Sequence, residues 1–420
     1  MTDIKNRRGI SLAKVKLLLL AGFIAFVGCI PQIKEAAMTP APKIRVLLNQ
    51  ITETDSLVFN STYEMKSEEA SYEFGKNNRR VYIEPGESGF QIYNENRIFK
   101  LNKYDVVIFS GKEDNAIFTF DGRRYTGDII LTLLPGPGLS VVNRLNLETY
   151  LSGVVPAEMP SRNEAYLDAL KAQAICARTY SMTQMDNRKN QPFDVYGDVR
   201  DQAYGGVDAE TPLAAEAVKQ THGDILMYKD KKAIVFYHST SGGVLESSQN
   251  VWSNINEPYL QSRQDALGNE FTSSISPYFR WSDTLSIGQL DKVFERKFNR
   301  SPLKKVTEDT AEVTFQAKVL ERTSSGRVAK MQIEYGDTTF TLSGYEIRNF
   351  FPGPNGRNLP STLFSIKNIS DSLMVINGGG YGHGVGMCQY GAMNMSQKGF
   401  KYYDILVNKY FMGTYLNKVY

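Results

Sequence analysis

The stretch PSRNEAYLDALKAQAICARTYSM, residues 160–182, marks a change of composition in this 420-residue chain. It is rich in alanine and other helix-favouring residues, and Ser161 with Glu164 forms a capping-box pattern directly after a proline. We therefore expect a helix over residues 162–184. Residues 44–150, which precede it, hold short apolar stretches, several of them alternating, separated by Gly, Asn and Asp. That pattern is typical of β-strands.

The remainder of the chain mixes both kinds of element. A second helix is predicted with Thr211 as N-cap, Pro212 at its first position and Gly223 as its stop. Further helices are expected at 284–299 and 403–411, strands at 233–238, 311–320, 328–335 and 338–342, and a hairpin turn at Asp121-Gly122. The mixed order predicts an α+β fold, with a β-rich N-terminal part and mixed α/β lobes flanking a substrate cleft.

The first 28 residues predict an export signal. Five basic residues precede an apolar run over residues 17–27, which is too short to span a bilayer. The run ends in Val27-Gly28-Cys29, which resembles the lipobox of bacterial lipoproteins. We expect a lipid on Cys29, a tether over 29–43, and an exported periplasmic or cell-envelope protein anchored to a membrane. An ordinary signal peptide with an incidental cysteine is the alternative.

The charge balance gives no reason to expect a nucleic-acid partner. The whole chain has 48 basic and 45 acidic residues, a net charge of +3. Removing the five basic residues and one acidic residue before Cys29 leaves 43 basic and 44 acidic residues, a net charge of −1. The apparent basicity therefore belongs to the export signal.

Cysteine and histidine spacing predicts no metal. Cys176 and Cys388 are the thiols left after Cys29. They could form a disulfide in an oxidising compartment, which the sequence leaves open. No pair has C-x-x-C spacing and the three histidines are far apart, so we expect neither a structural zinc nor a cofactor.

Two histidines lie in segments suited to binding. His238 ends a predicted strand and opens the turn STSGG, which brings Ser239 and Ser241 beside it. His383 lies in GGGYGHGVGMCQYGA, residues 378–392, where no register gives the dinucleotide pattern G-x-G-x-x-G. Its glycines would let a ligand approach the backbone closely. His222, just before Gly223, is better explained as a helix C-terminal residue.

A carboxylate stands in GVVPAEMP, residues 153–160, just before the helix at 162–184. This residue, Glu158, could be a simple dipole partner or cap. Lys171 and Arg178 on that helix are seven residues apart and share one stripe. We expect the three side chains to share a site, although two cations on a helix are more often a solvated face.

Several segments together resemble the SpoIID/LytB family, the stage II sporulation protein D-like proteins of the bacterial cell wall. They are VVNRLNLETYLSGVVPAEMP, ALKAQAICARTY, FYHSTSGG, LSGYEIRNFF, LPSTLFSI and GYGHGVGMCQYGA, in the family's order. The resemblance runs from about residue 44 to the end. It implies a SpoIID-like catalytic region over 151–420, with a strand and helix insertion at about 266–345, after the β-rich region 44–150.

The resemblance implies a peptidoglycan lytic transglycosylase with Glu158 as its catalytic acid/base. Lys171, Arg178, His238 and Gln389 fall where the family has cleft residues, and His383 and Tyr390 lie in the same matching block. We add Ser239 and Ser241 as substrate-binding residues. The chain departs from the family at Cys388, where Ser is usual, and residues 193–206 lack the Cys and His that bind zinc in some members.

A lytic transglycosylase fits the single carboxylate, because a glycoside hydrolase of the usual kind needs two. Two alternatives remain. Some relatives are non-catalytic enhancers of cell-wall amidases, which would bind peptidoglycan glycan strands and an amidase partner without cleaving the strand. The other alternative is a cysteine hydrolase that uses Cys388 with His383 or His238.

Overall fold

The structure is a computed structural model that describes residues 39–66, 71–75, 78–133, 138–299, 301, 315–353, 356–370 and 373–420. The predicted signal peptide 1–28 and Cys29 lie outside these residues. The chain divides into two units, Met1–Pro40 and Ala41–Tyr420, and every element below belongs to the second. No helix in these described ranges is both long and apolar enough to cross a membrane.

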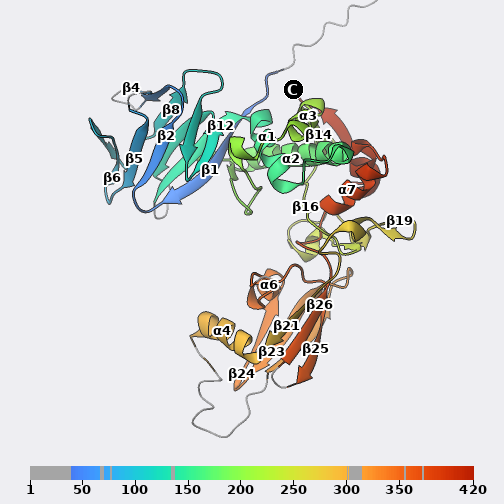
Figure 1. Cartoon of the computed structure of the whole chain (residues 1–420). Helices are drawn as coiled ribbons and strands as arrows, with labels where there is room; N and C mark the ends of the chain where they lie inside the picture. Colours follow the sequence, from blue (N-terminus) through green and yellow to red (C-terminus); the bar gives the residue numbers. More distant parts are fainter. Residues whose placement is uncertain are drawn as a thin grey trace, which may run out of the picture. The chain divides into compact units, whose positions relative to one another are not determined.

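The N-terminal region is built from strands, as expected (Figure 1). One sheet has the order β13-β1-β12-β11-β8-β3-β4 and the other β10-β9-β2-β5-β6-β7. Their bounds are β1 (Lys43–Ile51), β2 (Asp55–Phe59), β3 (Tyr63–Lys66), β4 (Ser71–Phe74), β5 (Arg80–Pro85), β6 (Gly89–Tyr93), β7 (Ile98–Asn102), β8 (Val107–Gly111), β9 (Ile117–Phe120), β10 (Arg123–Thr126), β11 (Asp128–Leu133), β12 (Leu139–Asn146) and β13 (Val195–Tyr196).

Alternation of apolar residues explains how these two sheets pack. Phe59 of one sheet contacts Tyr63 and Phe109 of the other, with ring centroids 4.9 and 5.2 Å apart. Inward side chains on alternate positions thus form a shared aromatic core. Asp121 and Gly122 have φ of 49° and 71° and join β9 to β10, which confirms the predicted hairpin turn.

Helices follow directly after β12. They are α1 (Leu147–Glu158), α2 (Leu167–Asn187) and α3 (Pro212–Gln220), with short 3-10 turns η1 (Glu164–Tyr166) and η2 (Gly206–Ala209). Thr211 caps α3 through a hydrogen bond from the Ala214 N–H, as predicted. The predicted capping box is wrong, because Asn163 caps η1 instead and the Ser161 hydroxyl bonds to Thr211.

Short strands and two helices complete this part of the chain. A parallel pair joins β16 (Tyr237–His238) to β27 (Met387–Cys388), and β14 pairs with β15 and β28. The other bounds are β14 (Asp224–Tyr228), β15 (Lys231–Lys232), β17 (Val244–Leu245), β18 (Arg263–Gln264), β19 (Ala266–Leu267), β20 (Glu270–Phe271), β28 (Tyr415–Lys418), α7 (Gln389–Gln397), the 3-10 turns η3 (Ser248–Asn250) and η4 (Thr272–Ile275), and η5 (Asp404–Tyr410).

Two predictions in this part need correction. The strand expected at 233–238 forms only at Tyr237–His238, because the Ala233 N–H bonds back to Leu226 across a turn and the Ile234 N–H bonds to the Tyr259 hydroxyl. The helix expected at 403–411 is a π-helix over Asp404–Tyr410.

A second lobe, residues 281–378, has a hydrophobic core of its own that includes Trp281, Phe294, Met331 and Ile376. Its elements are β21 (Trp281–Ser286), α4 (Ile287–Phe298), β22 (Phe315–Arg322), β23 (Val328–Tyr335), β24 (Thr338–Ser343), α6 (Tyr345–Phe350), β25 (Phe364–Ser370) and β26 (Leu373–Gly378).

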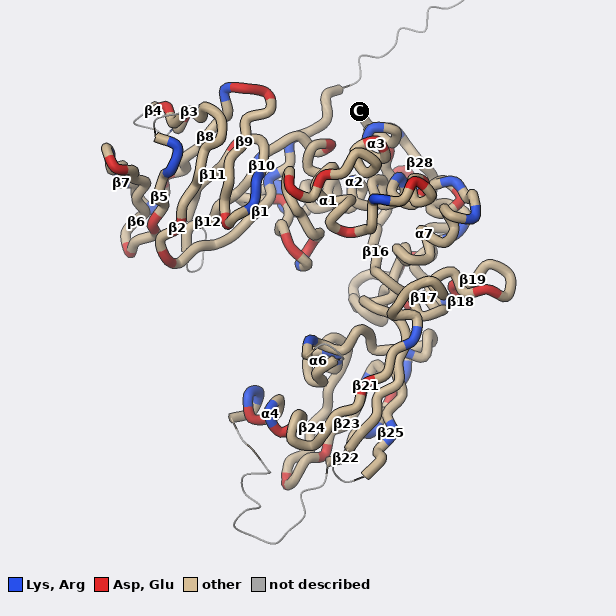
Figure 2. Tube along the Cα trace, viewed as in Figure 1, with Lys and Arg blue, Asp and Glu red and all other residues tan. Residues whose placement is uncertain are grey.

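The second lobe agrees well with its sequence pattern. Helix α4 lies within the predicted range 284–299, although residues 284–286 belong to β21, and β22, β23 and β24 overlap the predicted strands, of which residues 311–314 are outside the described ranges. Ser286 and Gln289 form a complete capping box at the start of α4. In Figure 2, basic and acidic segments are interspersed along the trace, with both signs on α4.

Candidate active site around Glu158

Glu158 is the last residue of α1, and not a residue near a helix N-terminus as expected. The helix begins at Leu147 and is capped by Asn146, whose side chain accepts a hydrogen bond from the Glu148 N–H. It ends because Met159, the residue before Pro160, is extended, with φ −138° and ψ 145°. This places the Glu158 carboxyl just beyond the last turn.

A loop after α2 holds the Glu158 carboxyl. The Ala203 N–H donates to Glu158 Oε1 over 2.7 Å. That loop is fixed against α1, since the Gly205 N–H bonds to the Gly153 carbonyl. A Cβ on Gly153 would lie 2.8 Å from the Tyr204 ring, so glycine permits the close approach of helix and loop.

The pKa of the Glu158 carboxyl is raised. Burial is the main cause, and the Ala203 N–H, the Gln389 amide and the Tyr237 hydroxyl only partly offset it. A helix C-terminus, where the backbone dipole is negative, acts in the same direction. The groups that offset burial are neutral donors and not cations, so burial prevails and shifts the carboxyl toward its protonated form.

Two glutamines from separate helices lie beside the carboxyl. Gln389, the first residue of α7, has its Nε2 3.4 Å from Glu158 Oε2 and 3.4 Å from Gln173 Oε1. Gln173 comes from the middle of α2 and is completely buried. Its own Nε2 has no hydrogen-bond partner among the described residues. The predicted site residue Gln389 therefore does meet Glu158.

A second series of hydrogen bonds, near the Glu158 carboxyl, begins at Tyr237 on β16. Its hydroxyl donates to Gln202 Oε1 over 2.9 Å, and Gln202 Nε2 donates to the Ser181 hydroxyl over 2.9 Å and to Tyr150 over 3.3 Å. Sequence reasoning missed Gln173, Gln202 and Tyr237. A glutamine inside an alanine-rich apolar helix is the single cue that could have singled out Gln173.

The two candidate histidines lie together. His238 Nδ1 donates to the Val385 carbonyl over 3.1 Å, the ring centroids of His238 and His383 are 5.6 Å apart, and Trp252 packs on His383. Burial, His383 and Arg327 lower the pKa of His238, and burial with Arg348 and Arg327 lowers that of His383 to about 3. Both rings are therefore neutral at physiological pH.

The strand geometry puts the histidine pair on a different face from Glu158. Tyr237 and His238 are successive residues of β16, so their side chains point to opposite faces. The Tyr237 side chain lies on the face near Glu158, whereas the His238 side chain contacts the glycine-rich loop at Val385. His383 lines a separate cavity of about 380 Å³ together with Arg327 and Tyr345.

The hydroxyl turn after His238 is mainly structural. Ser241, predicted to bind substrate, is completely buried, and its hydroxyl donates to Asp265 over 2.6 Å. Its hydroxyl is therefore engaged inside the protein, and a contact with substrate stays a prediction. Ser239 is half-buried, and its carbonyl accepts from the Tyr390 N–H over 3.1 Å. Tyr390 packs against the main hydrophobic core.

Arg178 is wrongly predicted as a substrate contact. Its guanidinium is completely buried and makes two 2.7 Å bonds to the Glu148 carboxylate. Its remaining donors reach the Asp224 and Val218 carbonyls. Lys171, on the same stripe, lies over the Tyr402 ring at 5.7 Å. This stripe of α2 faces the C-terminal segments, so the expected cluster with Glu158 does not form.

Cys388 is the N-cap of α7. Its sulfur accepts a hydrogen bond from the Gly391 N–H, a role that Ser often fills. Burial raises the pKa of the thiol to about 12, which leaves no thiolate for a nucleophile. Cys176 and Cys388 are both free and buried, so they do not form a disulfide in this structure. The buried thiol with its raised pKa argues against a cysteine hydrolase.

The glycines around His383 permit internal packing. Gly382, Gly384 and Gly386 have φ of 102°, 85° and 74°. A Cβ on Gly384 would lie 2.4 Å from the Arg327 guanidinium, and one on Gly386 would lie 2.1 Å from the Phe236 carbonyl. The need for glycine at Gly384 and Gly386 is therefore explained by contacts within the protein, and the approach of a sugar to this loop stays a prediction.

Comparisons with known proteins agree with the sequence resemblance. Residues 136–228 match the family model described as SpoIID, stage II sporulation protein, and residues 264–386 match a domain of unknown function, DUF8618. The chain is 30% identical to the stage II sporulation protein D of Bacillus amyloliquefaciens, over 65% of this chain and 74% of that protein. The chain belongs to the SpoIID family.

Two further relatives are similar over much of the chain. The chain is 31% identical to the amidase enhancer of Bacillus subtilis strain 168, over 63% of this chain and 40% of the enhancer, so it spans less than half of that relative. It is 32% identical to an uncharacterized protein of Brachyspira hyodysenteriae, over 74% of this chain and 78% of that protein.

Proposed function

We propose that the chain is a peptidoglycan lytic transglycosylase, exported and anchored to the cell envelope by a lipid on Cys29. One observation supports the activity above all others. Glu158 is a partly buried residue whose carboxyl accepts hydrogen bonds from neutral amides and has a raised pKa. Such a group is suited to deliver a proton near neutral pH.

In the proposed reaction Glu158 first acts as general acid. Oε1 accepts a short bond from the Ala203 N–H, over 2.7 Å, whereas the Gln389 amide reaches Oε2 only over 3.4 Å, so Oε2 is the oxygen better suited to carry the proton. It protonates the glycosidic oxygen between N-acetylmuramic acid and N-acetylglucosamine, and the bond from that oxygen to the muramic anomeric carbon breaks. The Ala203 N–H then stabilises the carboxylate that forms.

Glu158 next acts as general base. It takes the proton from the muramic C6 hydroxyl, whose oxygen bonds to the anomeric carbon of the same sugar. The product is a 1,6-anhydro end, no water is consumed, and the carboxyl is protonated again. A second carboxylate is not needed, in contrast to a glycoside hydrolase.

Mass spectrometry of purified glycan strands tests this proposal. The chain from residue 30 should generate anhydro-muramic ends, and Glu158→Gln should lower the rate by at least about 100-fold. Glu164→Gln is the matched control, because Glu164 is an exposed glutamate six positions further on. Anhydro ends from the Glu158→Gln protein at the wild-type rate would refute the assignment.

The second candidate is an amidase enhancer, and identity to a relative of that name favours it. In this case the chain binds glycan strands and stimulates a cell-wall amidase without cleaving the strand. Glu158→Gln should then leave stimulation of a purified N-acetylmuramoyl-L-alanine amidase unchanged. Loss of stimulation in this variant would instead tie the effect to glycan cleavage.

The lipid anchor has its own test. Cells fed a labelled fatty acid should incorporate the label into the wild-type chain and not into Cys29→Ser. Equal labelling of the two proteins, or no label in either, would contradict the anchor and leave an ordinary signal peptide.

A further inference from the structure

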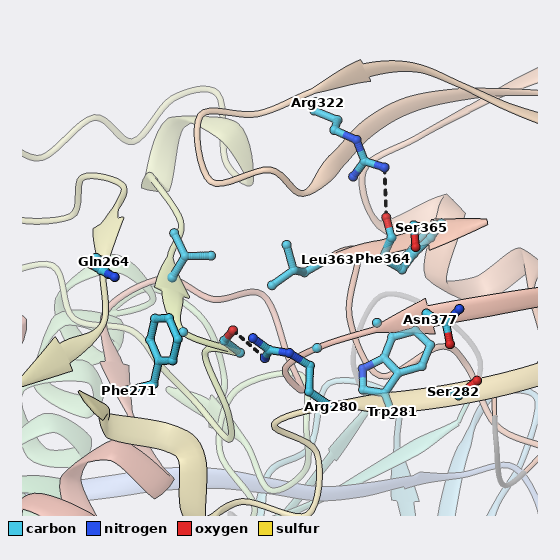
Figure 3. Close-up of a pocket in the computed structure, with 15 residues that line it drawn as sticks. Gln264, Phe271, Arg280, Trp281, Ser282, Arg322, Leu363, Phe364, Ser365 and Asn377 are labelled. Carbon is cyan, nitrogen blue, oxygen red and sulfur yellow. Dashed lines mark hydrogen bonds between the residues drawn. The ribbon is translucent and has the colours of Figure 1, made fainter. Parts of the chain in front are cut away.

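A large open cavity lies between the STSGG turn and the second lobe. Its volume is about 980 Å³, and none of the predicted site residues lines it. Gly242 and Gly243 of the turn and Phe271 of β20 form one side, and residues of β21, β25 and β26 form the other. Figure 3 shows Phe271 and Gln264 facing Trp281 and Asn377 across it. This size suits an extended ligand.

Two arginines give the cavity a positive charge. Arg280 Nη1 donates to the carbonyls of Gly242 and Phe279 at 3.0 and 2.6 Å, and Arg322 donates to those of Gly326 and Phe364. Figure 3 shows both guanidinium groups extending from opposite sides. The lining contains no aspartate or glutamate, and neither arginine forms an ion pair within the described ranges.

The arginines are both exposed and fixed in position. Carbonyl oxygens hold each guanidinium without neutralising it, and Arg280 also lies 4.0 Å from the centroid of the Phe279 ring. Exposed arginines without carboxylate partners usually sample many rotamers, so anchoring two of them at one cavity lowers the entropy cost of binding an anion. Guanidinium groups favour carboxylates through paired N–H donors.

The cavity wall is rigid because it is packed around glycines. A Cβ on Gly378 would lie 2.2 Å from the Trp281 ring, and one on Gly242 would lie 2.8 Å from the Gly380 nitrogen. The Trp281 indole N–H donates to the Gly380 carbonyl over 3.0 Å. This wall is therefore continuous with the glycine-rich loop that leads to Gln389 beside Glu158.

We propose that this cavity binds a carboxylate-bearing segment of peptidoglycan; the identity of the polymer rests on the function proposed above. The arginines pair with the carboxylate. The Gln264 and Asn377 amides bond to N-acetyl or peptide groups of the ligand, and Leu363 and Phe271 contact the apolar faces of its sugar rings. The carboxylate has two possible sources, the lactyl group of peptide-free muramic acid and the acidic stem peptide.

Calorimetry with the Glu158→Gln chain tests the proposal without turnover. The probes are a peptide-free muramic-containing tetrasaccharide, the tripeptide L-alanyl-γ-D-glutamyl-L-lysine, and neutral chitotetraose. Arg280→Gln with Arg322→Gln should weaken at least one anionic probe by tenfold or more and leave chitotetraose unchanged. Arg79→Gln with Arg80→Gln, an equal loss of charge at exposed positions, is the matched control and should bind as the parent does.

Whichever anionic probe loses affinity identifies the source of the carboxylate. Arg280→Lys with Arg322→Lys keeps the charge but loses the paired N–H donors, so its affinity should lie between those of the parent and the glutamine pair, which separates charge recognition from misfolding. The proposal is overturned if the glutamine pair binds both anionic probes as the control does, or if the parent binds neither. Failure of the anhydro-end assay would leave these affinities unaffected, so the two proposals fail separately.

Discussion

The Gln389 amide nitrogen lies 3.4 Å from Glu158 Oε2, although 231 residues separate the two in the chain. The first residue of α7 thus meets the last residue of α1. Burial raises the pKa of the Glu158 carboxyl, and the Gln389 contact partly offsets that shift while it helps to position the proposed acid.

Replacing Gln389 with Leu should change the pH profile of glycan cleavage. The Gln389 amide lowers the pKa of Glu158, so its loss raises that pKa. Since the general acid must be protonated, the alkaline limb of kcat/KM should move to higher pH, while the maximum falls roughly five- to tenfold, about the worth of one hydrogen bond. Gln397→Leu, at the exposed end of the same helix, should leave the limb in place.

Replacing Glu158 with Gln should stabilise the fold at neutral pH. The pKa of Glu158 is higher in the folded chain, so the carboxyl destabilises the folded state as pH rises through that value. Removing the charge should add about 0.5–2 kcal/mol at pH 7, and the difference should vanish below the ordinary carboxyl pKa. Thermal unfolding at pH 4 and pH 7 measures this. If the stability difference between Glu158→Gln and the parent were the same at pH 4 and pH 7, a raised pKa of Glu158 would be contradicted.

The Glu148–Arg178 pair should matter for stability and not for substrate binding. Burial alone would raise the pKa of Glu148, but Arg178 and Tyr420 hold it below its ordinary value. Arg178→Met leaves a buried carboxylate unpaired and should cost about 3–5 kcal/mol. The pair's contribution should be present above the ordinary pKa of a glutamate and be lost as pH falls through the lowered value.

Urea unfolding checks this pair against an exposed one. Arg200 pairs with Asp198 at the surface, with half of each side chain accessible, so Arg200→Met should cost less than about 1 kcal/mol. Equal costs for the two variants would show that burial does not set the value of the Glu148–Arg178 pair.

Cys388→Ser should fold and retain full activity, because a hydroxyl caps a helix as well as a thiol does. Cys388→Ala removes the acceptor for the Gly391 N–H and should cost about 1 kcal/mol. Thermal unfolding and the anhydro-end assay measure both effects. A folded, inactive serine variant would restore the thiol nucleophile as an alternative.

Gly384→Ala should destabilise the fold more than Gly399→Ala. The two glycines have nearly equal φ, 85° and 87°, so both variants carry about 1–2 kcal/mol of backbone strain. A Cβ at Gly399 meets open space, whereas one at Gly384 overlaps the buried Arg327 guanidinium. Equal losses in unfolding free energy would contradict a packing role for Gly384.

Local sequence signals predicted much of the fold. The alternating strands, the Thr211 cap and the helical pattern of α4 are set by residues close in sequence, so they were predicted without the structure, whereas the Ser286–Gln289 capping box was not. Helix α1 was missed, because Gly153, Pro156 and Pro160 all argue against a helix. Burial of its apolar face against the rest of the core overrides those preferences.

The sequence predicted the carboxylate of the candidate site but not most of the side chains around it. Glu158 and Gln389 were found through the family resemblance, whereas Gln173 and Tyr237 depend on which helix and strand faces meet. The helical period places Lys171 and Arg178 on one stripe of α2. It does not determine which part of the protein packs against that stripe. That depends on packing by segments more than 40 residues away.

The parallel pairing of Tyr237–His238 with Met387–Cys388 has a consequence for how the protein folds. The partners are 150 residues apart, and closing an unstructured loop of that length costs about 4 kcal/mol. The second lobe lies within this interval and has its own core, so its prior folding shortens the effective loop. We therefore expect α7 to dock late, which would make the neighbourhood of Glu158 the last part of the chain to become ordered.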